Sequence, residues 1–214
     1  MKMDMRDLTK SALTLPWAIS MFGVQQMANL AGAALAGASV GLPIEVMAGV
    51  LKHFGAGRLD NPGRLMRFDA RGVTVLVDYA HNADGLRGFL AVAAHIRGAG
   101  RLGVLLGHAG NRSDQDIREL ARVTMQFRPD LVVVKENEAY LRGRSLGEIP
   151  AILSTELTRL GLSAEAVPVV DNEIDAVRRA LAWAQAGDVL ALPVHSLKAR
   201  TAVIELLTPA AALR

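Results

Sequence analysis

The sequence predicts an α/β fold: a Rossmann-like, mainly parallel sheet flanked by helices and preceded by an N-terminal helical segment. From residue 65 onward, short apolar runs alternate with longer runs in which apolar residues recur at helical spacing. The short runs are continuously apolar, which is typical of parallel strands that are covered on both faces. Before that point the sequence shows helical patterns only.

The composition supports a large aliphatic core. Hydrophobic residues make up 51% of the 214 residues, whereas aromatic residues make up only 4%. The net charge of +3 is small and the basic residues are dispersed, so we expect no nucleic-acid partner. The chain contains no cysteine, which excludes disulfides, thiolate zinc sites and a cysteine nucleophile and suits a cytoplasmic protein.

The N-terminal segment, residues 1–54, is predicted to be helical. Small residues recur in "NLAGAALAGASVG", and Pro43 opens the helical pattern "PIEVMAGVLKHF". The longest apolar stretch carries Gln25, Gln26 and Asn29 near its centre, and such side chains are costly in lipid. We therefore expect buried helices and no membrane span, with a membrane-associated or self-associating helix as the alternative.

A loop rich in glycine and proline, residues 55–64 ("GAGRLDNPGR"), separates this segment from the rest of the chain. We place a domain boundary there, between a helical segment at residues 1–54 and an α/β domain at residues 65–214. A domain of that length can bury a core of its own.

Six segments of the α/β domain are predicted to be strands. The first two form a hairpin across "DARG", and the others are short apolar runs separated by helices. In chain order the strands read "LMRF", "VTVLVDY", "RLGVLLG", "DLVVVK", "EAVPVV" and "DVLALPV".

Five segments between and after these strands are predicted to be helices. We expect Ser113 to cap the second helix and Asp171 or Asn172 to cap the fourth, because these side chains accept hydrogen bonds from free backbone N–H groups. The predicted helices cover residues 83–100, 113–127, 145–161 (interrupted or begun near Pro150), 171–187 and 196–207.

Polar clusters follow four of the predicted strands. They are Asp78, His81 and Asn82, and then residues 107–116, 135–144 and 195–198. Parallel strands place their carboxyl ends along one edge of the sheet, which is where ligands bind in such folds. The sequence therefore predicts a polar binding site at that edge.

Several motifs resemble the Mur ligase superfamily, whose members use ATP to join an amino acid to a carboxylate. "NPGRLMRF" followed by "VLVDYAHNADGL" is similar to the motifs that begin the family's C-terminal domain, with Ala83 where proline is common. "GHAGNRSDQDIRELA" and "VVKENEAYLRGRSLGEIPAIL" look most like the cyanophycin synthetase branch. "GVQQMANLAGAALAGASVGL" resembles the end of the family's central domain, with Gln25 and Gln26 in place of a His-Asn pair.

The resemblance implies a nucleotide-binding site. Arg64 would reach the γ-phosphate, Asp78 the ribose hydroxyls and His81 a phosphate. Asn29 would contact adenine, Asn82 would join the site, and Arg64 and His81 are the candidates for catalysis. The alternatives are structural: Asp78 would cap a turn, Asn82 would cap a helix, and Arg64 would be a solvated loop residue.

The same resemblance implies that the loops after the third and fourth strands face an amino-acid substrate. The residues expected to bind its charged groups are Asn111, Arg112, Asp114, Arg142 and Arg144. An ordinary strand-to-helix loop with solvated arginines is the alternative. The five histidines lack a metal-ligand spacing, so we predict no resident metal, and magnesium would arrive only with ATP.

One departure limits the activity that we expect of this chain. The complete ligases need a phosphate loop with a Gly-Lys pair, and no Gly-Lys dipeptide occurs here. The resemblance thus implies the C-terminal portion of an ATP-dependent acid–amino-acid ligase, which closes on ATP, presents the amino acid and is inactive alone. Its expected partner is a chain that carries the phosphate loop, or a second copy bound through the N-terminal helices. The alternative is a non-catalytic paralogue that serves as a nucleotide-binding, anion-binding or assembly module.

Overall fold

The computed structural model describes residues 31–53, 63–136 and 138–208. The chain divides into two compact units, Met1–Pro62 and Gly63–Arg214. Within the described ranges, no helix is both long and apolar enough to cross a membrane.

The described part of the first unit contains a helix at residues 31–39 and helix α3 (Ile44–His53). The turn between them is closed by a hydrogen bond from the backbone N–H of Leu42 to the carbonyl of Gly37. A Cβ atom at Gly37 would lie 2.5 Å from the sulfur of Met47, so glycine leaves room for the methionine. The prediction of an N-terminal helical segment is confirmed for these residues.

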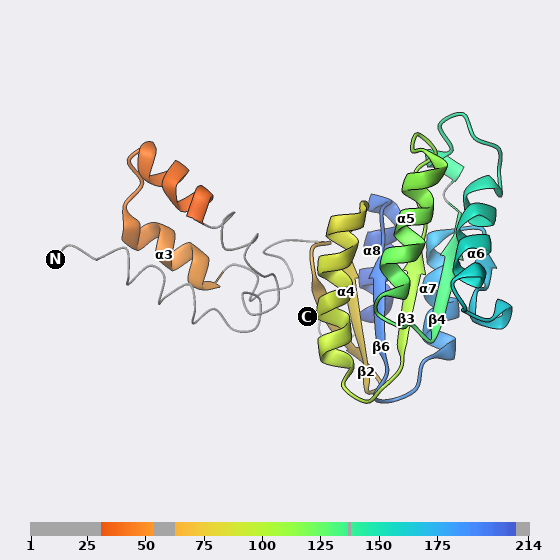
Figure 1. The fold of residues 1–214 in the computed structure, drawn as a ribbon. Helices are drawn as coiled ribbons and strands as arrows, with labels where there is room; N and C mark the ends of the chain where they lie inside the picture. Colours follow the sequence, from red (N-terminus) through yellow and green to blue (C-terminus); the bar gives the residue numbers. More distant parts are fainter. Residues whose placement is uncertain (1–30, 54–62, 137, 209–214) are drawn as a thin grey trace. The chain divides into compact units, whose positions relative to one another are not determined.

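The second unit is built on a six-stranded sheet with the strand order β1-β2-β6-β3-β4-β5 (Figure 1). The strands are β1 (Met66–Ala70), β2 (Val73–Asp78), β3 (Leu102–Leu106), β4 (Leu131–Lys135), β5 (Val169–Val170) and β6 (Val189–Pro193). The first two strands form an antiparallel hairpin, and every other pairing is parallel. The prediction of a mainly parallel sheet is therefore confirmed.

Helices cover both faces of this sheet (Figure 1). The helices on one face are α4 (Ala83–Arg97), α5 (Asp114–Met125) and α6 (Glu148–Arg159). Those on the other face are α7 (Glu173–Trp183) and α8 (Leu197–Leu207). Two short 3₁₀ helices, η1 (Glu138–Tyr140) and η2 (Ala164–Ala166), lie in the connections.

The core between the sheet and helices α7 and α8 is mainly aliphatic. Val75 and Val77 of β2 and Leu190 and Leu192 of β6 are fully buried in one cluster with Val177 of α7. Such contacts supply most of the stability of a domain, about 25 cal/mol for each Å² of apolar surface removed from water. The core predicted from the composition thus needs few aromatic residues.

Several helix starts follow the predicted caps. The side chain of Ser113 accepts a hydrogen bond from the backbone N–H of Asp116, and Asp116 in turn accepts from the backbone N–H of Ser113, which forms a capping box. Of the two candidates for the fourth helix, Asn172 is the cap, with its Oδ1 atom 2.9 Å from the backbone nitrogen of Asp175.

One boundary differs from the prediction. The run "EAVPVV" forms a strand only at Val169–Val170, because residues 164–166 form a 3₁₀ turn. The third predicted helix begins at Glu148, in agreement with a start near Pro150, and Gly147 before it has a left-handed φ of 81°. The difference lies in a loop, where local turn geometry outweighs the pattern of apolar residues.

Candidate functional site

Three histidines gather at the carboxyl edge of the sheet. His81, His195 and His108 follow β2, β6 and β3, which are adjacent in the sheet. The rings of His81 and His195 lie 5.1 and 5.7 Å from the ring of Tyr79, measured between centroids. The predicted convergence of polar loops at this edge therefore occurs in the folded chain.

Two arginines also converge on Tyr79. The Cζ atom of Arg64 lies 5.1 Å from the centroid of the Tyr79 ring, and that of Arg200 lies 4.9 Å from it. Such contacts stabilise a cation over an aromatic face. Tyr79 is thus the centre of a cluster, here called the Tyr79 cluster, made of Tyr79, Arg64, Arg200, His81 and His195.

Asp78 holds the segment that carries Arg64. Its Oδ2 atom accepts a hydrogen bond of 2.7 Å from the backbone N–H of Leu65. Burial raises the pKa of Asp78, while the Leu65 N–H and the charge of Arg64 partly oppose this rise. The carboxylate therefore fixes Arg64 next to the end of β2, and contact with a ribose stays a prediction.

The partly buried His195 and His108 are neutral at physiological pH. Burial, together with the nearby charge of Lys135, lowers the pKa of His195 to about 3. Its Nε2 atom lies 2.9 Å from the carbonyl oxygen of Ala80, and since a carbonyl can only accept, Nε2 carries the proton. Burial and the charge of Arg112 also lower the pKa of His108. The cluster is therefore cationic through its arginines rather than through the imidazole of His195.

A buried ion pair between Lys135 and Glu173 supports the loop that carries His195. The Nζ atom of Lys135, at the end of β4, pairs with the carboxylate of Glu173 and donates to the carbonyl of Pro193. The same carboxylate accepts the backbone N–H groups of His195 and Ser196, each at 2.8 Å. Glu173 thus fixes the loop that carries His195 and the start of α8.

Glycine at position 107 makes room for this pair. A Cβ atom there would lie 2.8 Å from Cγ of Lys135, in the stem of the buried lysine. The predicted Gly-rich loop that begins at Gly107 therefore serves first to admit a lysine side chain. An anion-binding role for that loop stays a prediction.

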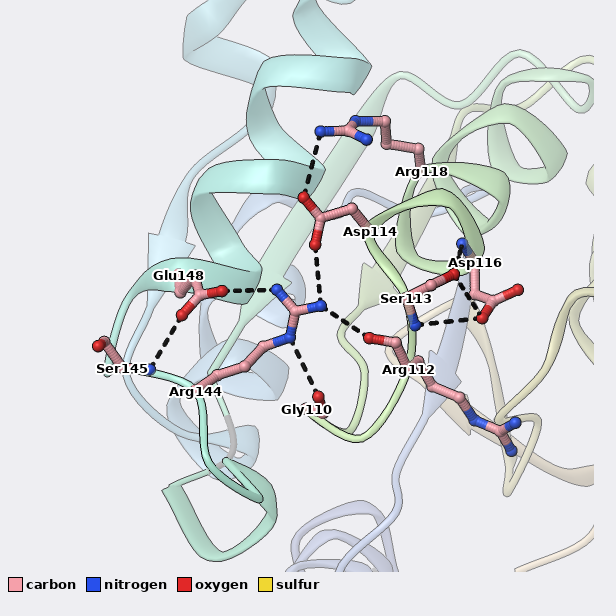
Figure 2. Close-up of polar contacts among 9 residues, drawn as sticks. All are labelled: Gly110, Arg112, Ser113, Asp114, Asp116, Arg118, Arg144, Ser145 and Glu148. Atoms are coloured by element: carbon pink, nitrogen blue, oxygen red, sulfur yellow. Dashed lines mark hydrogen bonds and ion pairs between the residues drawn. The ribbon is translucent and has the colours of Figure 1, made fainter.

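Arg144 joins the loops that follow β3 and β4 (Figure 2). Its Nε atom donates to the carbonyl of Gly110 at 3.0 Å, and Nη2 donates to the carbonyl of Arg112 at 2.7 Å. Nη1 lies 2.6 Å from Glu148, and Nη2 lies 2.8 Å from Asp114. All three guanidinium nitrogens are thus bound to protein, so Arg144 and Asp114 form a structural clasp, and a substrate would have to displace one of these bonds.

The other predicted substrate-binding residues are exposed. Asn111, Arg112 and Arg142 lie at the surface of the two loops. The guanidinium of Arg112 points away from the clasp (Figure 2), and its charge acts on His108. The Cζ atom of Arg142 lies 5.7 Å from the ring centroid of Tyr140. All three side chains are open to solvent, and their binding of an amino acid stays a prediction.

Two predicted nucleotide-binding residues remain. The Oδ1 atom of Asn82 accepts a 2.8 Å hydrogen bond from the backbone N–H of Gly85, which makes Asn82 the cap of α4, as its structural alternative predicted. Asn29, predicted to contact adenine, lies outside the described residues. In the described part of the chain, no group of three or more His, Asp or Glu side chains could hold a metal ion.

Sequence reasoning did not single out Tyr79, Arg200 or Glu173. Tyr79 lies inside the motif "DYAHN", but the sequence analysis assigns roles only to its neighbours Asp78, His81 and Asn82. One feature of the sequence could have indicated a residue such as Glu173. The apolar strand "DLVVVK" ends in a lysine, and a buried lysine needs a carboxylate nearby. No feature of the sequence indicates Arg200, because its position on α8 near Arg64 depends on the strand order.

Comparison with known proteins supports the resemblance. A family model described as "Mur ligase, glutamate ligase domain" matches residues 63–192, which is more than half of the chain. Cyanophycin synthetase from Geminocystis herdmanii is 28% identical over 92% of this chain and 22% of its own length. A UDP-N-acetylmuramoyl-L-alanyl-D-glutamate–2,6-diaminopimelate ligase from Geobacter metallireducens is 30% identical over 84% of this chain and 36% of its own length. The chain therefore spans only about a fifth to a third of these relatives.

Solved structures support the fold. UDP-N-acetylmuramate–alanine ligase from Thermotoga maritima matches 86% of this chain and 38% of its own, with a TM-score of 0.58 and 16% identity. A bifunctional folylpolyglutamate synthase/dihydrofolate synthase from Yersinia pestis, solved with AMPPNP and a manganese ion, matches 77% of this chain and 35% of its own. Its TM-score is 0.52 and its identity 19%.

Proposed function

Because the chain belongs to the Mur ligase family through its glutamate ligase domain, we propose that it is the part of an ATP-dependent acid–amino-acid ligase that closes on ATP and presents the amino acid. The observation that carries this proposal is the Tyr79 cluster, in which Arg64 and His81 come from the motifs shared with the family. In this reading the 214 residues have no ligase activity alone, because the phosphate loop must be supplied from outside them.

The residues of the cluster suit the phosphates of a nucleotide. The guanidinium of Arg64 is a donor for phosphate oxygens, and Asp78 holds its backbone segment in place. His81 is exposed, and its Nδ1 atom lies 3.2 Å from the carbonyl oxygen of Tyr79, to which it donates because a carbonyl can only accept. ATP would supply the phosphoryl group that activates a carboxylate, and these side chains would bind and orient it.

Magnesium would accompany ATP rather than occupy a site of its own. The described residues contain no cluster of metal-type ligands, whereas the cluster is rich in cationic donors. Magnesium commonly binds through substrate phosphates and few protein ligands, which fits this arrangement.

The amino acid would be presented by the two loops that Arg144 joins. Asn111, Arg112 and Arg142 are exposed on these loops, while Arg144 and Asp114 hold the loops together. A rigid pair of loops keeps the amine of a bound amino acid in a fixed position, which lowers the entropy cost of its attack. Arg112 and Arg142 would read a carboxylate of the substrate.

A second candidate is a non-catalytic assembly module. The observation that favours it is the exposure of Leu35, Val40, Val46 and Val50 in the first unit. Apolar side chains that gather on a surface usually mark an interaction site. In this reading the retained cluster would bind an anion or a nucleotide without turnover.

The test is a titration of the isotopically labelled chain with MgATP, followed by amide chemical shifts. We expect binding on the order of millimolar, about 4 kcal/mol, with shifts at residues 78–85 and 107–114. Arg64→Gln should weaken binding, whereas Arg71→Gln, in the hairpin turn at the opposite edge, should not. Shifts confined to that opposite edge, or none at about ten millimolar, would favour the assembly module.

A further inference from the structure

We propose that Arg200 acts with Arg64 to bind a phosphoryl group beside the ring of Tyr79. The proposal rests on the proposed function and deepens it, because it assigns a second guanidinium to the phosphate end of the nucleotide site. Arg200 lies on α8, far from Arg64 in the sequence, and the fold brings both residues to one aromatic ring.

Within residues 63–136 and 138–208, no carboxylate neutralises the positive charge of the two arginines by an ion pair. None of the ion pairs between described residues includes Arg64 or Arg200. Asp78 acts on Arg64 through its charge, yet its Oδ2 atom is bound to the Leu65 N–H. Two like charges held at one ring repel each other, and an anion between them removes that repulsion.

Arg200 also holds a buried donor that lacks an acceptor. Its Nε atom is shielded from solvent and has no hydrogen-bond partner among the described residues. A buried N–H without a partner is unfavourable, and a charged oxygen acceptor compensates it strongly. Arg144 provides the contrast, since each of its guanidinium nitrogens is bound to protein. An arginine with a purely structural role is expected to resemble Arg144.

Gly63 keeps Arg200 close to the segment that carries Arg64. A Cβ atom at Gly63 would lie 2.7 Å from Nη1 and 3.0 Å from Cδ of Arg200, and its φ of 78° also favours glycine. The guanidinium of Arg200 therefore packs directly against the backbone before Arg64. A ligand that contacts one arginine is within reach of the other.

The charge of the site indicates a phosphoryl group rather than a single carboxylate. A terminal phosphate carries close to two negative charges at neutral pH and offers three acceptor oxygens, which matches two guanidinium groups. Its source is either a nucleoside triphosphate or a free polyphosphate. A carboxylate carries one charge and would leave one arginine unpaired.

The test follows the Nε–H resonance of Arg200 in the 214-residue chain during titration with inorganic tripolyphosphate, MgATP, adenosine and glutamate. We expect the resonance to move with tripolyphosphate and MgATP, and to stay in place with adenosine and glutamate at the same concentrations. Arg200→Gln should weaken both active ligands about ten-fold or more, which corresponds to one charge-assisted hydrogen bond. Arg178→Gln, an exposed arginine on α7, is the matched control and should change neither affinity.

The outcomes separate this proposal from the function on which it rests. In the first outcome, MgATP shifts the amide resonances of residues 78–85, but the Arg200 resonance does not move or Arg200→Gln leaves the affinity unchanged. That outcome would overturn the phosphoryl site and leave the nucleotide function standing. In the second outcome, tripolyphosphate moves the Arg200 Nε–H resonance and binds as tightly as MgATP, and the nucleoside adds no further chemical-shift changes. That outcome would support the phosphoryl site and overturn the nucleotide function. An equal response to glutamate would overturn the phosphoryl assignment, and no response to any ligand would overturn both.

Discussion

The Nε atom of Arg144 donates a hydrogen bond to the carbonyl oxygen of Gly110 at 3.0 Å, which ties together two loops that are separated in the sequence (Figure 2). The backbone N–H of Gly110 donates to the carbonyl of Tyr140 at 2.8 Å, so the loops are joined by backbone bonds as well. The shape of the predicted amino-acid site therefore depends on residues that need not touch the substrate.

Arg144→Lys should destabilise the chain by about 1–3 kcal/mol, because a lysine cannot form the forked set of bonds that the guanidinium makes. Urea unfolding measures the change, and amide resonances of residues 107–113 should broaden. The matched control is Arg142→Lys, whose side chain is exposed, and we expect a change within about 0.5 kcal/mol. Equal stability of the two variants would contradict the structural role of Arg144.

Gly110→Ala should also destabilise the chain, by about 2 kcal/mol or more, because the added Cβ would overlap the carbonyl oxygen of Leu141. The control is Gly88→Ala in the middle of α4, where no atom lies within 4 Å of the added Cβ. That variant should gain up to about 1 kcal/mol from helix propensity. A similar stability for both variants in urea would show that the two loops do not pack as closely as described.

Glu173→Gln should cost about 3–5 kcal/mol, because it leaves the buried charge of Lys135 without its partner. The backbone N–H groups of His195 and Ser196 would also lose a charged acceptor. The double variant Lys135→Met with Glu173→Gln should recover part of the loss, since no isolated charge then remains buried. A single variant as stable as the unmodified chain would argue against the ion pair.

Stability should fall as the pH falls below about 6.5, in part through His195. The folded state holds this imidazole neutral with a pKa of about 3, whereas the unfolded chain has the ordinary value of 6.5. The unfolded state therefore binds more protons between these values, and the stabilisation that is complete above pH 6.5 is lost on acidification. At pH 5 the loss amounts to about 2 kcal/mol.

His195→Gln isolates this effect, because the glutamine amide can donate to Ala80 without binding a proton. Urea unfolding at pH 7.5 and pH 5 should show a smaller difference for this variant than for the unmodified chain. Identical pH dependence in the two proteins would mean that His195 is not held neutral by burial.

The first unit should drive association. Leu35, Val46 and Val50 are 64, 54 and 60% exposed, so three large apolar side chains face solvent. Sedimentation velocity at micromolar concentration should show a homo-oligomer, and the triple glutamine variant at these positions should shift it toward the monomer. Leu197→Gln in the second unit, where the leucine is 72% exposed, should leave the assembly unchanged. A monomer in the unmodified chain would contradict the prediction.

Local patterns in the sequence were sufficient to predict the class of fold and most element types. The continuous apolar runs predicted the buried strands, and Ser113 and Asn172 marked helix starts, because a cap needs only the residue itself and the next turn. The pattern does not predict the 3₁₀ turn before Val169, because a short 3₁₀ turn and a short strand share the same apolar residues. The motif around Asp78 and His81 also predicted that polar residues gather at the carboxyl edge of the sheet, since parallel strands end together.

The sequence by itself determined where strands end, which helices are capped and which polar residues follow the strands, because these depend on the spacing of near neighbours. The tertiary structure alone decided which of those residues meet. The last strand, β6, lies between β2 and β3, and this order carries α8 and Arg200 to the segment of Arg64. No local pattern encodes that order, because it follows from how the whole set of apolar strands and helices packs into one core.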